Sequence, residues 1–81
     1  MDIGMMWFDN DPKTGLLTKI ERAAEYYRNK YGCRPDLCLV NPTMLPAMKM
    51  NTGGITVRSF RSILPGILWL GVNDRQQANR A

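Results

Sequence analysis

The sequence contains no histidine among its 81 residues. Histidine is the commonest general base near neutral pH and the commonest zinc ligand, so its absence excludes imidazole-dependent triads and most zinc sites. Any catalysis would have to rely on carboxylates, lysine, tyrosine or a thiolate. We therefore expect a protein that is not an enzyme and that binds no cofactor or metal ion.

Cysteine is also scarce, because the chain has only Cys33 and Cys38, separated by four residues. This spacing matches neither a redox pair nor a zinc knuckle. The charge of Arg34 favours a thiolate at Cys33, but no histidine is present to activate it. We expect Cys38 to pack as a small apolar residue within a strand.

Long apolar runs are missing as well. The longest, ILPGILWLGV at residues 63–72, is about half the ~20 residues of a membrane span and is interrupted by Pro65 and Gly66. The opening MDIGMMWF has an acidic residue where a secretory signal is basic, so we expect a cytoplasmic protein with no membrane partner. The length predicts one domain, residues 1–74, followed by a polar tail, residues 75–81.

What is present includes a clear helix signal between residues 11 and 32. Asp11 suits the cap, Pro12 the first turn and Gly32 the left-handed stop, although the first turn could instead begin after Thr14. The residues that recur at three- and four-residue steps and predict the buried face are Leu16, Ile20, Ala23, Ala24, Tyr27 and Tyr31. Lys19 falls mainly outside this face, so we expect it in solvent.

Four short apolar segments predict strands, at residues 3–8, 37–41, 55–60 and 67–72. The first two flank the helix and predict a β-α-β unit with parallel strands, and the last two predict a hairpin that turns at Pro65 and Gly66. Residues 43–50 could add one or two helical turns. The expected fold is α+β in two layers, a β-α-β unit plus a C-terminal β-hairpin, with about four strands in a mixed sheet and one long helix on one face.

Asp9 and Asp11 follow the first strand in the motif FDND. Over these residues the chain resembles the haloacid dehalogenase phosphotransferases, whose first strand ends in a nucleophile and an acid; Pro12 and Lys13 replace the usual glycine and threonine. The strand-helix opening is also similar to that of the small ferredoxin-like integration subunit of CRISPR systems, and we transfer no residues from it. We favour a structural interpretation, in which Asp9 favours a turn and Asp11 caps the helix.

The positive charge is concentrated in the second half of the chain. Residues 1–36 carry equal numbers of basic and acidic residues, so the whole net charge of +4 arises after residue 36. Lys49, Arg58 and Arg61, with Phe60 beside them, have the basic and aromatic character of a nucleic-acid contact. Binding of nucleic acid through these three basic residues is therefore our alternative hypothesis. The simpler explanation is that the charge only maintains solubility.

The apolar residues of the strands occupy both faces of the expected sheet. One long helix can cover only one face, so the other needs the segment 43–50, through Met44, Leu45 and Met48, or a second molecule. We therefore predict a small interaction module that self-associates, most simply as a homodimer, or that binds another protein. The expected interface residues are Trp7, Trp69 and Leu70, because large apolar side chains dominate interface energetics.

Overall fold

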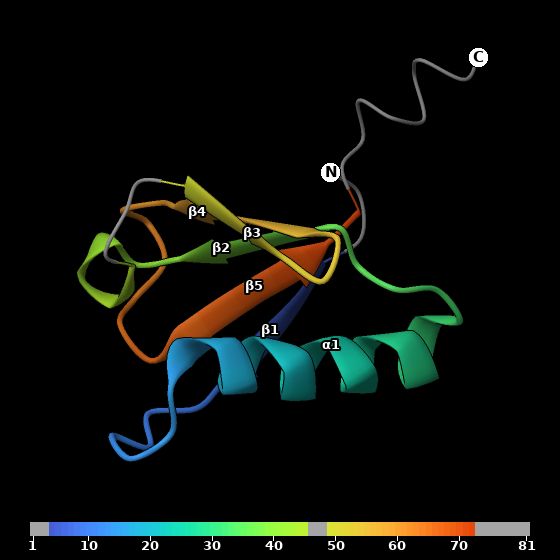
Figure 1. Ribbon diagram of the computed structural model, residues 1–81, viewed down its shortest axis with the longest axis horizontal. Helices are drawn as coiled ribbons and strands as arrows, with labels where there is room; N and C mark the ends of the chain where they lie inside the picture. Colours follow the sequence, from blue (N-terminus) through green and yellow to red (C-terminus); the bar gives the residue numbers. More distant parts are fainter. Residues whose placement is uncertain (1–3, 46–48, 73–81) are drawn as a thin grey trace.

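A computed structural model of the chain describes residues 4–45 and 49–72, with the backbone alone for Lys49. It contains one α-helix and five strands (Figure 1). The elements, in chain order, are β1 (Gly4–Phe8), α1 (Leu16–Tyr31), β2 (Leu37–Val40), the short 3-10 helix η1 (Pro42–Met44), β3 (Lys49–Thr52), β4 (Ile55–Ser59) and β5 (Ile67–Gly71). The helix packs on one face of the sheet, so the predicted α+β class with two layers is confirmed.

The five strands form one mixed sheet in the order β1-β5-β2-β4-β3. β5 pairs antiparallel with both β1 and β2, which makes β1 and β2 parallel to each other, as expected for strands on either side of a crossover helix. β2 pairs parallel with β4, and β3 pairs antiparallel with β4. β5, the last strand among the described residues, therefore lies inside the sheet.

The hairpin of the sheet lies at a different place from the predicted one. β4 and β5 are separated by β2, whereas β3 and β4 pair directly around Gly53 and Gly54. Both glycines have positive φ angles, 55° and 83°, as the tight turns of two-residue hairpins require. The segment after β4 instead crosses the end of β2, where the Phe60 N–H donates to the Val40 carbonyl at 2.8 Å.

The boundaries of α1 correct one prediction and confirm another. The helix begins at Leu16 with Gly15 as its cap residue, so Asp11 lies outside the helix and does not cap it. The alternative start after Thr14 is therefore confirmed. At the other end Gly32 adopts φ 82° and its N–H donates to the Arg28 carbonyl at 2.8 Å, which confirms the predicted left-handed stop.

The core lies between α1 and the sheet. The buried residues of the helix include Ile20, Ala23, Ala24 and Tyr27, as the spacing predicts, but Leu16 is only partly buried and Tyr31, at the last turn, is exposed. They belong to one cluster with the strand residues Met5, Cys38, Val40, Ile55, Val57, Leu68 and Leu70. Lys19 is also buried, contrary to expectation, because its ammonium group reaches back to donate to the Asp9 carbonyl at 2.9 Å.

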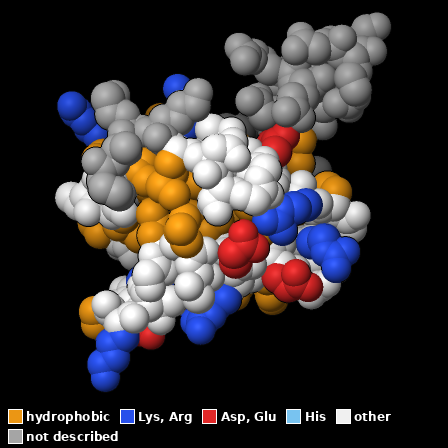
Figure 2. Space-filling view, in the orientation of Figure 1, with side chains coloured by type: hydrophobic (Ala, Val, Ile, Leu, Met, Phe, Trp, Pro, Cys, Tyr) orange, Lys and Arg blue, Asp and Glu red, His pale blue; other side chains and the backbone are white. Residues whose placement is uncertain are grey.

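The described part of the segment after β2, residues 41–45, packs at the core and does not extend over the opposite face of the sheet. Leu45 is buried in the core cluster, and Met44 packs against it. The Met44 sulfur accepts a hydrogen bond from the Gly66 N–H at 3.2 Å. Figure 2 shows apolar side chains gathered between α1 and β3, and acidic and basic side chains mixed over the C-terminal half of α1. Met48, predicted to help cover the second face, lies outside the described residues.

Candidate binding face

The face of the sheet opposite α1 is called the open face below, because no helix among the described residues covers it. Strand residues alternate between the two faces. Cys38 and Val40 point into the core, so Leu37 and Leu39 lie on the open face. The same alternation places Met6 and Phe8 there, and their side chains are 62% and 68% exposed. The open face is thus rich in apolar side chains.

The strand register sets one continuous row of residues across the open face. Met6 pairs with Trp69, Trp69 with Leu39, Leu39 with Arg58, and Arg58 with Lys49. The row is apolar on the β1 side and basic on the β4 side. The side chain of Lys49, at the end of the row, lies outside the described part of the structure. The face is therefore amphipathic across its width.

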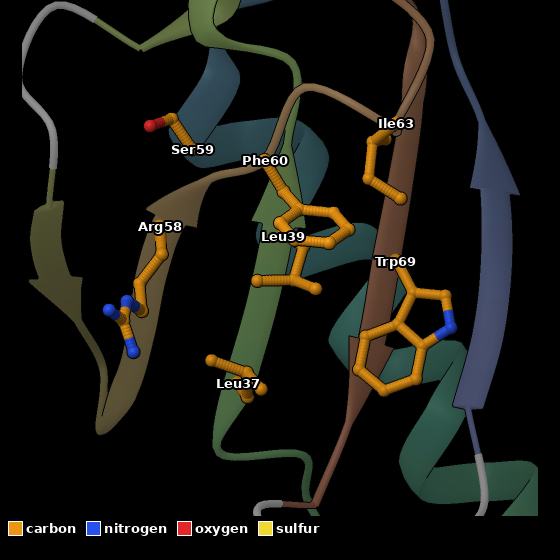
Figure 3. Close-up of a pocket in the computed structure, with 7 residues that line it drawn as sticks. All are labelled: Leu37, Leu39, Arg58, Ser59, Phe60, Ile63 and Trp69. Carbon is orange, nitrogen blue, oxygen red and sulfur yellow. The ribbon is translucent and has the colours of Figure 1, made fainter. Parts of the chain in front are cut away.

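A hollow of about 540 Å³ lies on the β2–β4 side of this face (Figure 3). It is lined by Leu37, Leu39, Arg58, Ser59, Phe60, Ile63 and Trp69. Figure 3 looks onto the open face, with α1 behind the sheet: Leu37 and Leu39 form the floor, Phe60 and Ile63 lie at one end, and Arg58 and Trp69 stand on opposite sides. The hollow is therefore mainly apolar and has one charged residue in its lining.

The segment after β4 builds the end wall of the hollow. The Ile63 N–H donates to the Phe60 carbonyl at 3.1 Å, and the Asn41 side-chain amide donates to the Ile63 carbonyl at 2.9 Å. Ile63 is buried as a result, while Phe60 stays 49% exposed. The wall is thus attached to the end of β2, and the shape of the hollow depends on contacts between segments that are distant in the sequence.

Trp69 owes its position to a glycine on the neighbouring strand. A Cβ atom at Gly4 would lie 2.0 Å from Cζ2 of the indole and 2.3 Å from Cε2, far closer than atoms can approach. The ring therefore lies directly over the Gly4 backbone, where any side chain would displace it. Gly4 also pairs with Gly71 on β5.

The described charged residues on and beside this hollow are two arginines. Arg58 lines the hollow, and Arg61 is exposed in the segment that follows β4. Neither forms an ion pair with any described residue. No acidic residue belongs to the lining, since the described acids lie in the loop after β1, on α1 and before β2. No described acid therefore competes with an anionic ligand for the guanidinium group of Arg58.

The structure separates the three predicted interface residues. Trp69 lies on the open face, whereas Leu70 is 0% exposed in the core beneath α1 and has no surface to offer a partner. Trp7 also lies on the helix side, where its ring centroid is 5.4 Å from that of Tyr26. The exposed apolar residues of β1 are Met6 and Phe8, which take the place of Trp7 and Leu70 as candidates for an interface. The alternation within β1 already grouped these two residues on one face.

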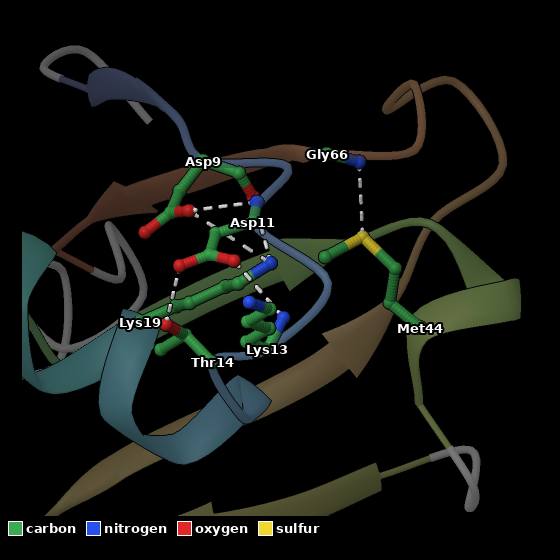
Figure 4. Close-up of polar contacts among 7 residues, drawn as sticks. All are labelled: Asp9, Asp11, Lys13, Thr14, Lys19, Met44 and Gly66. Atoms are coloured by element: carbon green, nitrogen blue, oxygen red, sulfur yellow. Dashed lines mark hydrogen bonds and ion pairs between the residues drawn. The ribbon is translucent and has the colours of Figure 1, made fainter.

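The two aspartates of the FDND motif are engaged within their own loop (Figure 4). Asp9 Oδ1 accepts from the Asp11 N–H at 3.1 Å, and Asp11 accepts from the Lys13 N–H and the Thr14 hydroxyl, both at 2.9 Å. Lys19 donates to the Asp9 carbonyl and lies 3.9 Å from its carboxylate. The predicted turn at Asp9 is therefore present, and both carboxylates stabilise the connection from β1 to α1.

The two cysteines differ strongly in their surroundings. Cys38 is fully buried in β2, as predicted, and burial raises the pKa of its thiol to about 12. Cys33 is exposed in the connection from α1 to β2. The thiol of Cys38 therefore stays protonated and shielded from solvent at neutral pH.

Comparison of the chain with protein-family models, curated proteins and solved structures gave no match in any of the three. Across the described ranges, 4–45 and 49–72, no group of three or more histidine, cysteine, aspartate or glutamate residues could hold a metal ion. No helix in the described part of the chain is long and apolar enough to cross a bilayer. Function must therefore be inferred from the chemistry of the open face.

Proposed function

We propose that this protein is a small non-enzymatic interaction module that self-associates through the β1 side of its open face. The observation that supports it best is that β1 is an edge strand among the described strands and that its residues Met6 and Phe8 are both largely exposed. Apolar side chains concentrated at one exposed edge mark association sites, because burying them removes apolar surface from water.

The charge distribution favours β1 over the other edge strand as the surface that meets a second copy. β1 contains Gly4, Met5, Met6, Trp7 and Phe8, with no charge and no proline to discourage pairing. β3 contains Lys49 and lies beside Arg58, so two copies meeting there would bring like charges together. Two β1 strands related by a two-fold axis can instead pair antiparallel and extend the sheet.

Sedimentation equilibrium tests this proposal. We expect a dimer at micromolar concentration and a return to monomer in Met6→Lys, since the new charge lies at the uncharged edge. Leu17→Lys is the matched control, because Leu17 is an exposed apolar residue on α1, in the other layer, and should leave the dimer intact. A single species near 9.2 kDa over a wide concentration range would contradict self-association.

Nucleic-acid binding is a second candidate function, supported by Arg58 on the open face and by the exposed Arg61 just beyond β4, neither of which pairs with a described acid. Arg58 and Arg61 flank the half-exposed Phe60, and a phosphate backbone with a stacked base suits such a group. Anisotropy of labelled single-stranded and duplex oligonucleotides across a salt series tests it. A steep fall in affinity with salt, and a weaker salt dependence in the Arg58→Gln/Arg61→Gln variant, are expected. Unchanged affinity in that double variant would reject it.

A further inference from the structure

The hollow on the open face combines an apolar floor with Arg58, the one charged residue of its described lining, and self-association at β1 uses neither. Leu37 and Leu39 on β2 form the floor, and Ile63 and Phe60 close one end. Its volume of about 540 Å³ falls within the range of roughly 300–1,000 Å³ typical of small-molecule sites. The hollow therefore has the size and the lining of a ligand site.

Arg58 and Trp69, on opposite sides of the hollow, define the width that a ligand would span. They lie in one row, on either side of Leu39, on strands that are both neighbours of β2. Two interstrand spacings separate their backbones by about 10 Å. An apolar chain of that length can cover Leu39 and the Trp69 ring while its charged end reaches Arg58.

Arg58, the one charged residue in the described lining, favours an anionic ligand. Arg58 forms no ion pair with a described residue, and no acid belongs to the lining. A carboxylate carries one charge and matches the fork of one guanidinium group. A phosphate monoester carries roughly −1.5 to −2, and a polynucleotide needs a series of cations along its backbone. One arginine in an apolar hollow therefore suits a carboxylate best.

We propose that the hollow binds a small amphiphilic carboxylate, an apolar chain of about 10 Å with one terminal carboxylate group. The chain lies across Leu39 toward Trp69, and the carboxylate accepts hydrogen bonds from the Arg58 guanidinium. This site goes beyond the proposed self-association, because it is lined by residues of β2, β4, β5 and the segment after β4, and by none of β1.

Titration calorimetry with octanoate, kept below its micelle concentration, tests the proposal. Acetate supplies the charge without the chain, and 1-octanol the chain without the charge. We expect saturable octanoate binding, with both analogues weaker by about tenfold or more, because each lacks one half of the recognition. Absence of saturable octanoate binding, or equal affinity for 1-octanol, would overturn the proposal.

A pair of arginine variants locates the bound carboxylate. Arg58→Gln should weaken octanoate binding by about tenfold or more, whereas Arg61→Gln, at an exposed arginine outside the lining, should leave it unchanged. Far-UV circular dichroism confirms that both variants are folded. Equal affinity in the two variants would overturn the assignment. Displacement of octanoate by oligothymidylate that depends on both arginines would also overturn it, in favour of nucleic acid.

Discussion

Replacing Gly4 by alanine should destabilise the protein solely through Trp69. The new Cβ would lie 2.0 Å from Cζ2 of the indole, and the φ angle of Gly4 is not positive, so the backbone itself accepts alanine. Overpacking of this kind costs about 1–3 kcal/mol. In a Trp69→Leu background the ring is gone, and glycine to alanine at a compatible position stabilises by about 0.4–1 kcal/mol. The effect of Gly4→Ala should therefore change sign between the two backgrounds.

Urea denaturation followed by far-UV circular dichroism measures this effect in the wild type, the two single variants and the double variant. Circular dichroism is preferred to fluorescence because Trp69→Leu removes one of the two tryptophans. We expect a coupling free energy of at least about 1 kcal/mol between positions 4 and 69. Gly15→Ala is the control for additivity, since no atom lies within 4 Å of its added Cβ. An equal loss of stability from Gly4→Ala in both backgrounds would show that the indole does not crowd this strand.

Three further predictions concern the loop after β1 and the thiols. The hydrogen bonds from the Lys13 N–H and the Thr14 hydroxyl lower the pKa of Asp11. The ionised Asp11 carboxylate therefore contributes to stability above about pH 4, and this contribution is lost as the pH falls through the lowered pKa. The loss of stability caused by Asp11→Ala should accordingly become smaller when unfolding is measured at increasingly acidic pH. Lys19→Met should lower the free energy of unfolding by about 1.5–3 kcal/mol in urea titrations, because it removes a charged donor from the Asp9 carbonyl; an unchanged midpoint would contradict this. A thiol reagent should label one cysteine per native chain, Cys33, and two after unfolding; rapid native labelling of Cys38 would contradict its burial.

The helix and the fold class could be predicted because their signals are local. Buried positions at helical spacing identified the face of α1, and Gly32 identified its end. Lys19 could not be assigned to the interior from its type, because its burial depends on the Asp9 carbonyl ten residues away. Asp11 lost the role of cap because its carboxylate binds the turn that precedes Gly15.

The strand order could not be predicted from local sequence patterns. The pair Gly53-Gly54 is a hairpin signal, but the strand before it has Met50 as its one large apolar residue and gives little periodicity. β5 is apolar on both faces, so its sequence does not say which side meets the helix. For that reason Leu70 and Trp69 could not be separated into core and surface without the three-dimensional structure.

The hollow was equally inaccessible to sequence reasoning. Its floor comes from β2, its sides from β4 and β5, and its end wall from a segment attached through Asn41 to Ile63. Arg58 was identified from charge alone. Its placement opposite Trp69 follows from the pairing of β2 with both β4 and β5, which no single segment encodes.

The central position of β5 also has a consequence for how the chain can fold during synthesis. Among the described strands β1 pairs with β5 alone, and β5 is what joins β1 to β2. Until residues 67–71 have been synthesised, β1 has no described strand to join. The strands β2, β4 and β3 can already pair with one another, but the core beneath α1 can be completed only after residues 67–71 have emerged and joined β1 to them.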